Sequence, residues 1–204
     1  KYSNFAMCNG FNQFSIQSDD GAGGDFFRTT QNGKSWTDGI ASENYNNLDF
    51  GTENNRWIFN DGQYMVLPDP YYIWNGYPNP RGAILTSSDG LNWNLADYFP
   101  TDHWIDGDSL ITDVIFSHTA NYYVTVMSNN NDEECAYIYA SPKGDRSNFS
   151  LVGTINNIAT NGADYSNNLC EFDGLLWYVY RKAPFANSNL WVASSPDGAS
   201  WTDR

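Results

Sequence analysis

A short phrase recurs four times along this chain, and its regular spacing limits the possible folds more than any other feature. The phrases are TQNGKSW at 30–36, SSDGLNW at 87–93, SPKGDRSNF at 141–149 and SPDGASW at 195–201. The phrase returns after 57, 54 and 54 residues, counted between its glycines Gly33, Gly90, Gly144 and Gly198. A near-constant period of this size indicates a repeat architecture, in which each unit buries its apolar face against a neighbouring unit.

Each phrase is preceded by three short β-type runs and followed by a fourth. In the second unit these runs are RWIFN, QYMVL and AILTS before the phrase, and NWNLADY overlapping its end. The runs are rich in aromatic and β-branched residues with polar alternation, and turn residues bound them. No segment shows a sustained helical period. Four antiparallel strands per unit of about 50 residues is the pattern of a β-propeller blade.

The sequence therefore predicts an all-β protein, a β-propeller with four blades of four antiparallel strands. We expect one domain over residues 1–204, with blades at about 1–39, 54–99, 109–155 and 167–204. Because the units contain whole blades, we expect the ring to close by packing of the fourth blade on the first.

Composition excludes several classes of partner. The net charge is −14 and the isoelectric point is about 4.1, which argues against nucleic acid and against anionic membranes, since both require a cationic surface. No apolar stretch approaches the length of a membrane span, so we predict no membrane insertion. The three cysteines, Cys8, Cys135 and Cys170, form no metal-binding CxxC pair, and we expect buried free thiols. A disulfide between Cys8 and Cys170 stays open, because the first and fourth units become neighbours if the ring closes. We predict no cofactor.

The recurring phrase has a structural explanation. In S-x-D-G-x-x-W the Asp or Asn accepts backbone N–H bonds within a tight turn, and Gly takes a positive φ. The aromatic residue then packs back against the sheet. We accordingly assign structural turn roles to Asn32, Trp36, Asp89, Trp93, Phe149, Asp197 and Trp201.

The phrase resembles the Asp-box turn of sialidase-like β-propellers, S-x-D-x-G-x-x-W, but it is one residue shorter because Asp89 and Asp197 directly precede their glycines. The whole unit also resembles a repeat found in phage tail and bacterial surface proteins. The resemblance covers all four units, although the third lacks the Asp and the Trp. It implies that these turns support the fold.

Two enzyme classes share such turns. A sialidase would carry an Arg-x-Pro signature near its first blade, which this chain lacks. Five-bladed glycosidases resemble the chain as well, and that resemblance implies paired carboxylates on the innermost strands of different blades. The candidates are Asp49 or Glu53, Asp113 and Glu171. Since only four units are visible, this interpretation requires a further blade outside the chain.

The lengths of the predicted links suggest where a ligand would bind. The links from the first to the second strand and the links within the phrase are short. The links from the second to the third strand and the links between blades are long. In a propeller the short links fall on one face and the long links on the other. Binding residues concentrate on elaborated loops. The long links contain aromatic side chains that suit sugar rings or a protein interface: Tyr71, Tyr72, Trp74, Tyr77, His103 and Trp104.

Acidic clusters in the long links raise the question of a metal site. Asp106-Gly107-Asp108 and Asp132-Glu133-Glu134 offer oxygen ligands for calcium, but neither has the spacing of a complete calcium loop. We favour solvated acidic clusters and leave the metal open.

The sequence alone favours a non-catalytic binding or structural module of a phage appendage or a secreted surface protein. In this interpretation the partner is a glycan, a protein receptor or another virion protein, and the location is virion or extracellular. The alternative is a glycan-processing hydrolase, sialidase-like or similar to five-bladed glycosidases, of which this chain is part. A third possibility is an architectural virion protein without a ligand.

Overall fold

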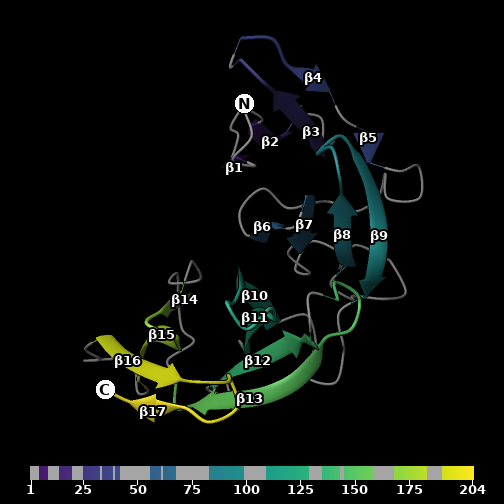
Figure 1. Ribbon diagram of the computed structural model, residues 1–204. Helices are drawn as coiled ribbons and strands as arrows, with labels where there is room; N and C mark the ends of the chain where they lie inside the picture. The colour runs from purple at the N-terminus through teal and green to yellow at the C-terminus, as the bar shows by residue number, and fades with distance from the viewer. Residues whose placement is uncertain are drawn as a thin grey trace. The chain divides into compact units, whose positions relative to one another are not determined.

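The computed structural model describes residues 5–8, 14–19, 25–32, 34–38, 40–41, 56–60, 62–67, 83–98, 109–128, 135–142, 145–158, 168–182 and 190–204. Within these ranges every strand belongs to one of four sheets (Figure 1). The chain divides into two compact units, Lys1–Phe99 and Pro100–Arg204. Each unit is described by itself.

The first unit contains two sheets. The first sheet has the order β1-β2-β3-β4, with strands Phe5–Cys8, Phe14–Asp19, Asp25–Thr30 and Thr37–Asp38. The second sheet has the order β5-β9-β8-β7-β6, with strands Ile40–Ala41, Arg56–Asn60, Gln63–Leu67, Ala83–Ser87 and Asn92–Tyr98 for β5 to β9. All pairings are antiparallel except that of β5 with β9, which is parallel.

The second unit contains the other two sheets, both four-stranded, antiparallel and in sequence order. The third sheet consists of β10 to β13, at Ser109–Phe116, Tyr122–Ser128, Cys135–Ser141 and Ser150–Asn156. The fourth sheet consists of β14 to β17, at Leu169–Phe172, Leu175–Arg181, Leu190–Ser195 and Thr202–Asp203.

The core of the second unit lies between its two sheets. One buried cluster joins Tyr123, Ile138 and Ile155 of the third sheet to Leu176 and Tyr178 of the fourth. All seven residues of β12 are buried, so this strand is covered on both faces. Burial of this kind is the main source of stability in stacked sheets.

The turn of the fourth repeat lies directly on the third sheet. A Cβ atom added at Gly153 of β13 would lie 2.2 Å from the backbone oxygen of Gly198. The phenolic O–H of Tyr123 donates to the backbone oxygen of Asp197 at 3.2 Å. Only a glycine on β13 permits this close approach.

These sheets confirm the prediction of an all-β fold built from repeated antiparallel sheets. The prediction of four strands per unit is wrong for the second sheet, which gains β5 from the stretch that we assigned to a link. Two residues are too few to produce a recognisable strand pattern. Closure of a four-bladed ring involves both units and stays a prediction, as do the single domain and the blade boundaries.

Candidate functional site

Two of the carboxylates proposed from the sequence lie on the first strands of the third and fourth sheets. Asp113 is on β10, Glu171 is on β14, and these two strands are in contact. The other candidates, Asp49 and Glu53, lie outside the described residues. The contacts of two of the four candidate carboxylates can therefore be described in the second unit.

Asp113 is buried, with 7% of its surface exposed. One carboxylate oxygen accepts the backbone N–H of Val114 at 2.8 Å, and the other accepts the backbone N–H of Leu169 at 2.9 Å. A buried carboxylate must be compensated by hydrogen bonds of this kind. Asp113 therefore ties β10 to β14, and its oxygens are directed at the backbone.

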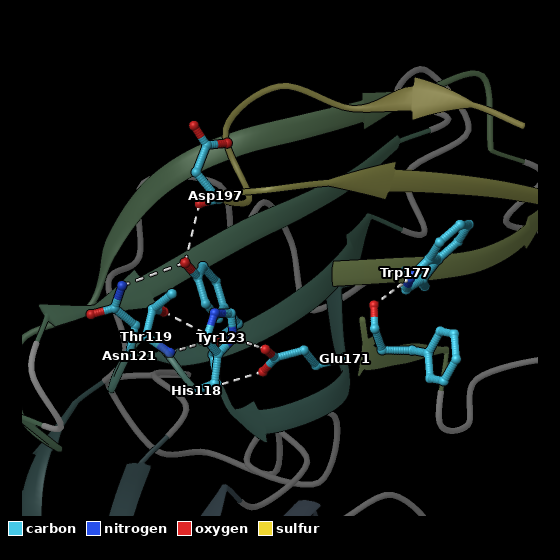
Figure 2. Close-up of polar contacts among 9 residues, drawn as sticks. His118, Thr119, Asn121, Tyr123, Glu171, Trp177 and Asp197 are labelled. Atoms are coloured by element: carbon cyan, nitrogen blue, oxygen red, sulfur yellow. Dashed lines mark hydrogen bonds and ion pairs between the residues drawn. The ribbon is translucent and has the colours of Figure 1, made fainter. Parts of the chain in front are cut away.

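Glu171 makes the reciprocal connection. One of its oxygens accepts the backbone N–H of His118 at 2.9 Å, and the other pairs with Nδ1 of the His118 ring (Figure 2). The His118 side chain is 59% exposed and the Glu171 side chain is 18% exposed. This contact fixes the turn after β10 against β14. It also leaves the imidazole open to solvent while a carboxylate sets its orientation.

The recurring turns of the first unit hold their acidic or amide side chains inward toward backbone N–H groups. Oδ1 of Asp89 accepts the N–H groups of Leu91 and Asn92, each at 2.8 Å. Oδ1 of Asn32 accepts from the N–H groups of Lys34 at 2.8 Å and Ser35 at 2.9 Å. Equivalent turns are therefore built by equivalent bonds.

The environment of Asp89 shifts its acidity strongly. Partial burial raises the pKa of the carboxyl, but hydrogen bonds outweigh this effect and lower the pKa to about 2. The donors are the backbone and side-chain amides of Asn92, the N–H of Leu91 and the hydroxyl of Ser87. Asp89 therefore stays ionised, as a turn acceptor requires.

The turn of the fourth repeat follows the same scheme. Oδ1 of Asp197 accepts the N–H of Ala199 at 2.9 Å and that of Ser200 at 3.4 Å, and these bonds lower the pKa of Asp197. Gly198 has a φ of 79°.

The third repeat uses a residue that the sequence analysis missed. Oδ1 of Asp145 accepts the N–H of Ser147 at 2.9 Å and its hydroxyl at 2.7 Å, and these bonds lower the pKa of Asp145. The Asp follows Gly144 in this repeat, whereas in the second and fourth repeats it precedes the glycine. A search for an acidic residue on either side of the glycine would have found it.

The turn aromatics occupy environments that differ between repeats. Phe149 is 6% exposed and Trp36 is 39% exposed. Trp201 packs on the core cluster, and its indole N–H donates to the backbone oxygen of Gly198 at 2.8 Å. The side chain of Trp93 lies outside the described residues.

A polar cavity of about 500 Å³ lies between the turns of the first and second repeats. Its lining includes Gln31, Asn32, Ser35, Asp89 and Leu91. The bonds described above already direct Asn32 and Asp89 at backbone N–H groups. This cavity therefore contains no carboxylate arranged for acid–base chemistry.

The predicted ligand-binding residues Tyr71, Tyr72, Trp74, Tyr77, His103 and Trp104 all lie outside the described residues, as do the acidic clusters at 106–108 and 132–134. Among the residues that are described, no group of three or more His, Cys, Asp or Glu could hold a metal ion. Within the same ranges, no helix is long and apolar enough to span a membrane. Cys135 is a buried free thiol and Cys170 is an exposed one.

No protein-family model matches the chain, and a search of curated proteins found no match. Solved structures do match. The endo-arabinase from Bacteroides thetaiotaomicron is 12% identical with a TM-score of 0.51, and the match covers 99% of this chain and 79% of that one. An endo-1,4-beta-xylanase from the same organism is 12% identical with a TM-score of 0.53, covering 100% and 73%. The Penicillium chrysogenum alpha-L-arabinanase is 11% identical with a TM-score of 0.55, covering 94% and 62%.

These matches show a propeller repeat fold, and the matched structures are five-bladed β-propeller glycosidases. They overturn the main functional interpretation from the sequence, a non-catalytic module of a phage appendage or surface protein. That interpretation was wrong because the recurring turns support the fold of catalytic and non-catalytic propellers alike, so they do not discriminate between the two. The alternative named from the sequence, a glycan-processing hydrolase, agrees better with these structures.

Proposed function

We propose that this protein is a glycan-processing hydrolase. The observation that carries the proposal is the match of nearly the whole chain to propellers solved as an arabinase, a xylanase and an arabinanase. Hydrolysis of a glycosidic bond requires two carboxyl groups, one as an acid and one as a base or nucleophile.

Asp113 and Glu171 are better suited to positioning than to catalysis. Asp113 is buried and accepts two backbone N–H groups, so its oxygens have no access to a substrate. Glu171 accepts from the backbone and side chain of His118 near the short link between β10 and β11. We assign both residues to fixing the inner strands.

Other candidate carboxylates lie shortly before the first strands of two sheets in the sequence. Glu53 precedes β6 and Asp108 precedes β10, with Asp49 and Asp106 slightly farther upstream. The same links contain or adjoin the aromatic residues that suit sugar rings, including Trp104 just before Asp106. Carboxylates and stacking surfaces in the same links are the combination that a glycosidase needs. The proposal includes the extracellular location expected from the sequence.

The test is hydrolysis of arabinan, xylan and 4-nitrophenyl glycosides by the purified protein, measured as released reducing sugar or nitrophenol. We expect turnover of at least one substrate. At least one of Glu53→Gln and Asp108→Asn should lower kcat by about 100-fold or more, the usual loss on removing a general acid or base, without changing the thermal unfolding midpoint.

Asp173→Asn, in the exposed turn after β14, is the matched control and should retain full activity. Trp74→Ala and Trp104→Ala should raise KM with a smaller effect on kcat, because stacking contributes to binding. Absence of hydrolysis on every substrate would contradict the proposal, and so would full activity in both carboxylate variants.

A further inference from the structure

The cavity between the turns of the first and second repeats lies within the first unit, where the chain crosses from one sheet to the next. β4 ends at Asp38 and β5 begins at Ile40. β5 pairs with β9, and Ile40 is the partner of Asn92 (Figure 1). The N–H of Asn92 belongs to the turn that Asp89 holds. This short crossing therefore keeps the two turns beside each other.

The cavity lies at one end of the second sheet. Tyr64 pairs with Phe59 near the end of β6 and with Ser87 at the end of β8. The turn after Ser87 is therefore level with the end of β6. The candidate carboxylate Glu53 precedes the start of β6 in the sequence, and that start pairs with the other end of β7. A ligand in the cavity would thus be held separately from the start of this inner strand.

The lining carries polar groups that the turns do not use. Asn32 accepts the turn N–H groups through Oδ1, so its Nδ2 remains a donor. Gln31, Ser35 and Thr37 line the same cavity, and the turn bonds described above use none of their side-chain groups. Hydroxyl and amide groups both donate and accept hydrogen bonds. They match a ligand whose own groups also do both.

The charge of the cavity argues against other classes of ligand. Among the described residues that line it, Asp89 is the charged one, and its carboxyl stays ionised because hydrogen bonds lower its pKa to about 2. It would repel an anion. A single carboxylate falls short of the oxygen ligands that calcium requires, and Leu91 alone offers little surface to an apolar ligand. A neutral ligand rich in hydroxyl groups fits best.

We propose that this cavity is a binding site for a short segment of a neutral glycan. Its volume of about 500 Å³ is within the range of about 300–1,000 Å³ that small-molecule sites occupy. A sugar presents hydroxyl groups in several directions, so it can bond to side chains from both turns. The choice of a glycan rests on the proposed function, whereas the cavity and its polarity do not. Binding there requires no hydrolysis.

The test is a titration of the isotope-labelled protein with xylohexaose and with arabinohexaose, followed through its backbone amide signals in NMR spectra. We expect saturable shifts of the signals of Ser35, Thr37 and Leu91 with at least one of these sugars. Trigalacturonic acid, which is anionic, should bind at least about tenfold more weakly because Asp89 repels it. Unshifted signals with both neutral sugars would overturn the proposal, and so would tighter binding of the anionic one.

Ser35→Tyr and Ser200→Tyr form a matched pair. The two serines hold the same position in the phrase and are both exposed, and their N–H groups donate to Asn32 and to Asp197. Ser35→Tyr keeps this donor but places a ring in the cavity, so the dissociation constant should rise at least about tenfold. Ser200→Tyr should leave it unchanged. Unchanged affinity in a folded Ser35→Tyr protein would contradict the proposal.

Gln31→Ala tests the site without added bulk, should Ser35→Tyr fail to fold. Loss of one hydrogen bond should weaken binding by about fivefold, and unchanged affinity would again contradict the proposal. The same titration separates this site from the proposed function. Hydrolysis without shifts at the cavity would refute the cavity site alone, whereas saturable shifts without hydrolysis of any substrate would refute the hydrolase alone.

Discussion

The backbone N–H of Leu169 donates to a carboxylate oxygen of Asp113 at 2.9 Å, joining the first strands of the third and fourth sheets. The other oxygen of the same carboxylate holds the N–H of Val114. One buried side chain therefore satisfies two backbone donors on two different strands.

Replacing Asp113 with Ala should strongly destabilise the second unit. Both N–H groups would lose their acceptor in a buried environment, at about 1–3 kcal/mol each, so we expect the free energy of unfolding to fall by about 2–6 kcal/mol. Urea denaturation followed by tryptophan fluorescence measures this change. A loss below about 0.5 kcal/mol would show that water replaces the carboxylate and that Asp113 does not position β14.

The acidity of Asp89 predicts a stability change at low pH. Its pKa is about 2 in the folded protein, against 3.8 for an unperturbed aspartate. A depressed pKa contributes stability that is fully present above the unfolded value and is lost as the pH falls through the folded value. We therefore expect the temperature at the unfolding midpoint to fall as the pH is lowered from about 4 to about 2. Asp89→Asn should make this part of the decrease shallower. Identical pH profiles for Asp89→Asn and the parent protein would contradict the assignment.

Two glycines separate backbone strain from steric contact. Gly198 and Gly174 have φ values of 79° and 73°, so alanine is strained at both. A Cβ atom at Gly198 would also lie 2.8 Å from Cε1 of Tyr123, whereas at Gly174 no atom lies within 4 Å. Gly174→Ala should cost about 1 kcal/mol, and Gly198→Ala should cost clearly more. Thermal melts of the two variants test this order, and equal losses would show that Tyr123 moves aside freely.

The turn aromatics should differ in their contribution to stability. Phe149 is buried, so Phe149→Ala should lower the free energy of unfolding by about 3–5 kcal/mol, the usual range for emptying a large aromatic site. Trp36 is 39% exposed, and Trp36→Ala should cost less. Chemical denaturation of the pair measures the difference. A larger loss for Trp36 would show that the exposed ring has a packing role that its environment does not suggest.

Much of the fold could be predicted from the sequence because each unit carries its own local signals. The strands around Val114, Val124 and Ile138 combine β-branched and aromatic residues with turn residues at both ends, which is the pattern of a short strand. The glycine of each phrase marks a turn by its positive φ where this is described, as at Gly90 and Gly198. Local steric requirements of this kind are visible in one sequence.

Contacts between neighbouring repeats were harder to predict. The bonds from Asp113 to Leu169 and from Glu171 to His118 join residues 56 and 53 positions apart. Nothing in the local pattern of either segment distinguishes a carboxylate that holds a neighbouring strand from one that faces a substrate. The same limit explains the wrong functional interpretation, because turn residues such as Asp89 report on folding and not on chemistry.

The reciprocal contacts between β10 and β14 also restrict how the repeats of this chain can be duplicated or exchanged. When the third and fourth repeats are aligned by their strand pairings, Val114 matches Leu169 and Asp113 matches Asn168. A copy of the fourth unit inserted in place of the third would therefore bring an amide where the inner strand needs a carboxylate. The third and fourth repeats are therefore complementary and not interchangeable, because each supplies the acceptor for a donor on the other.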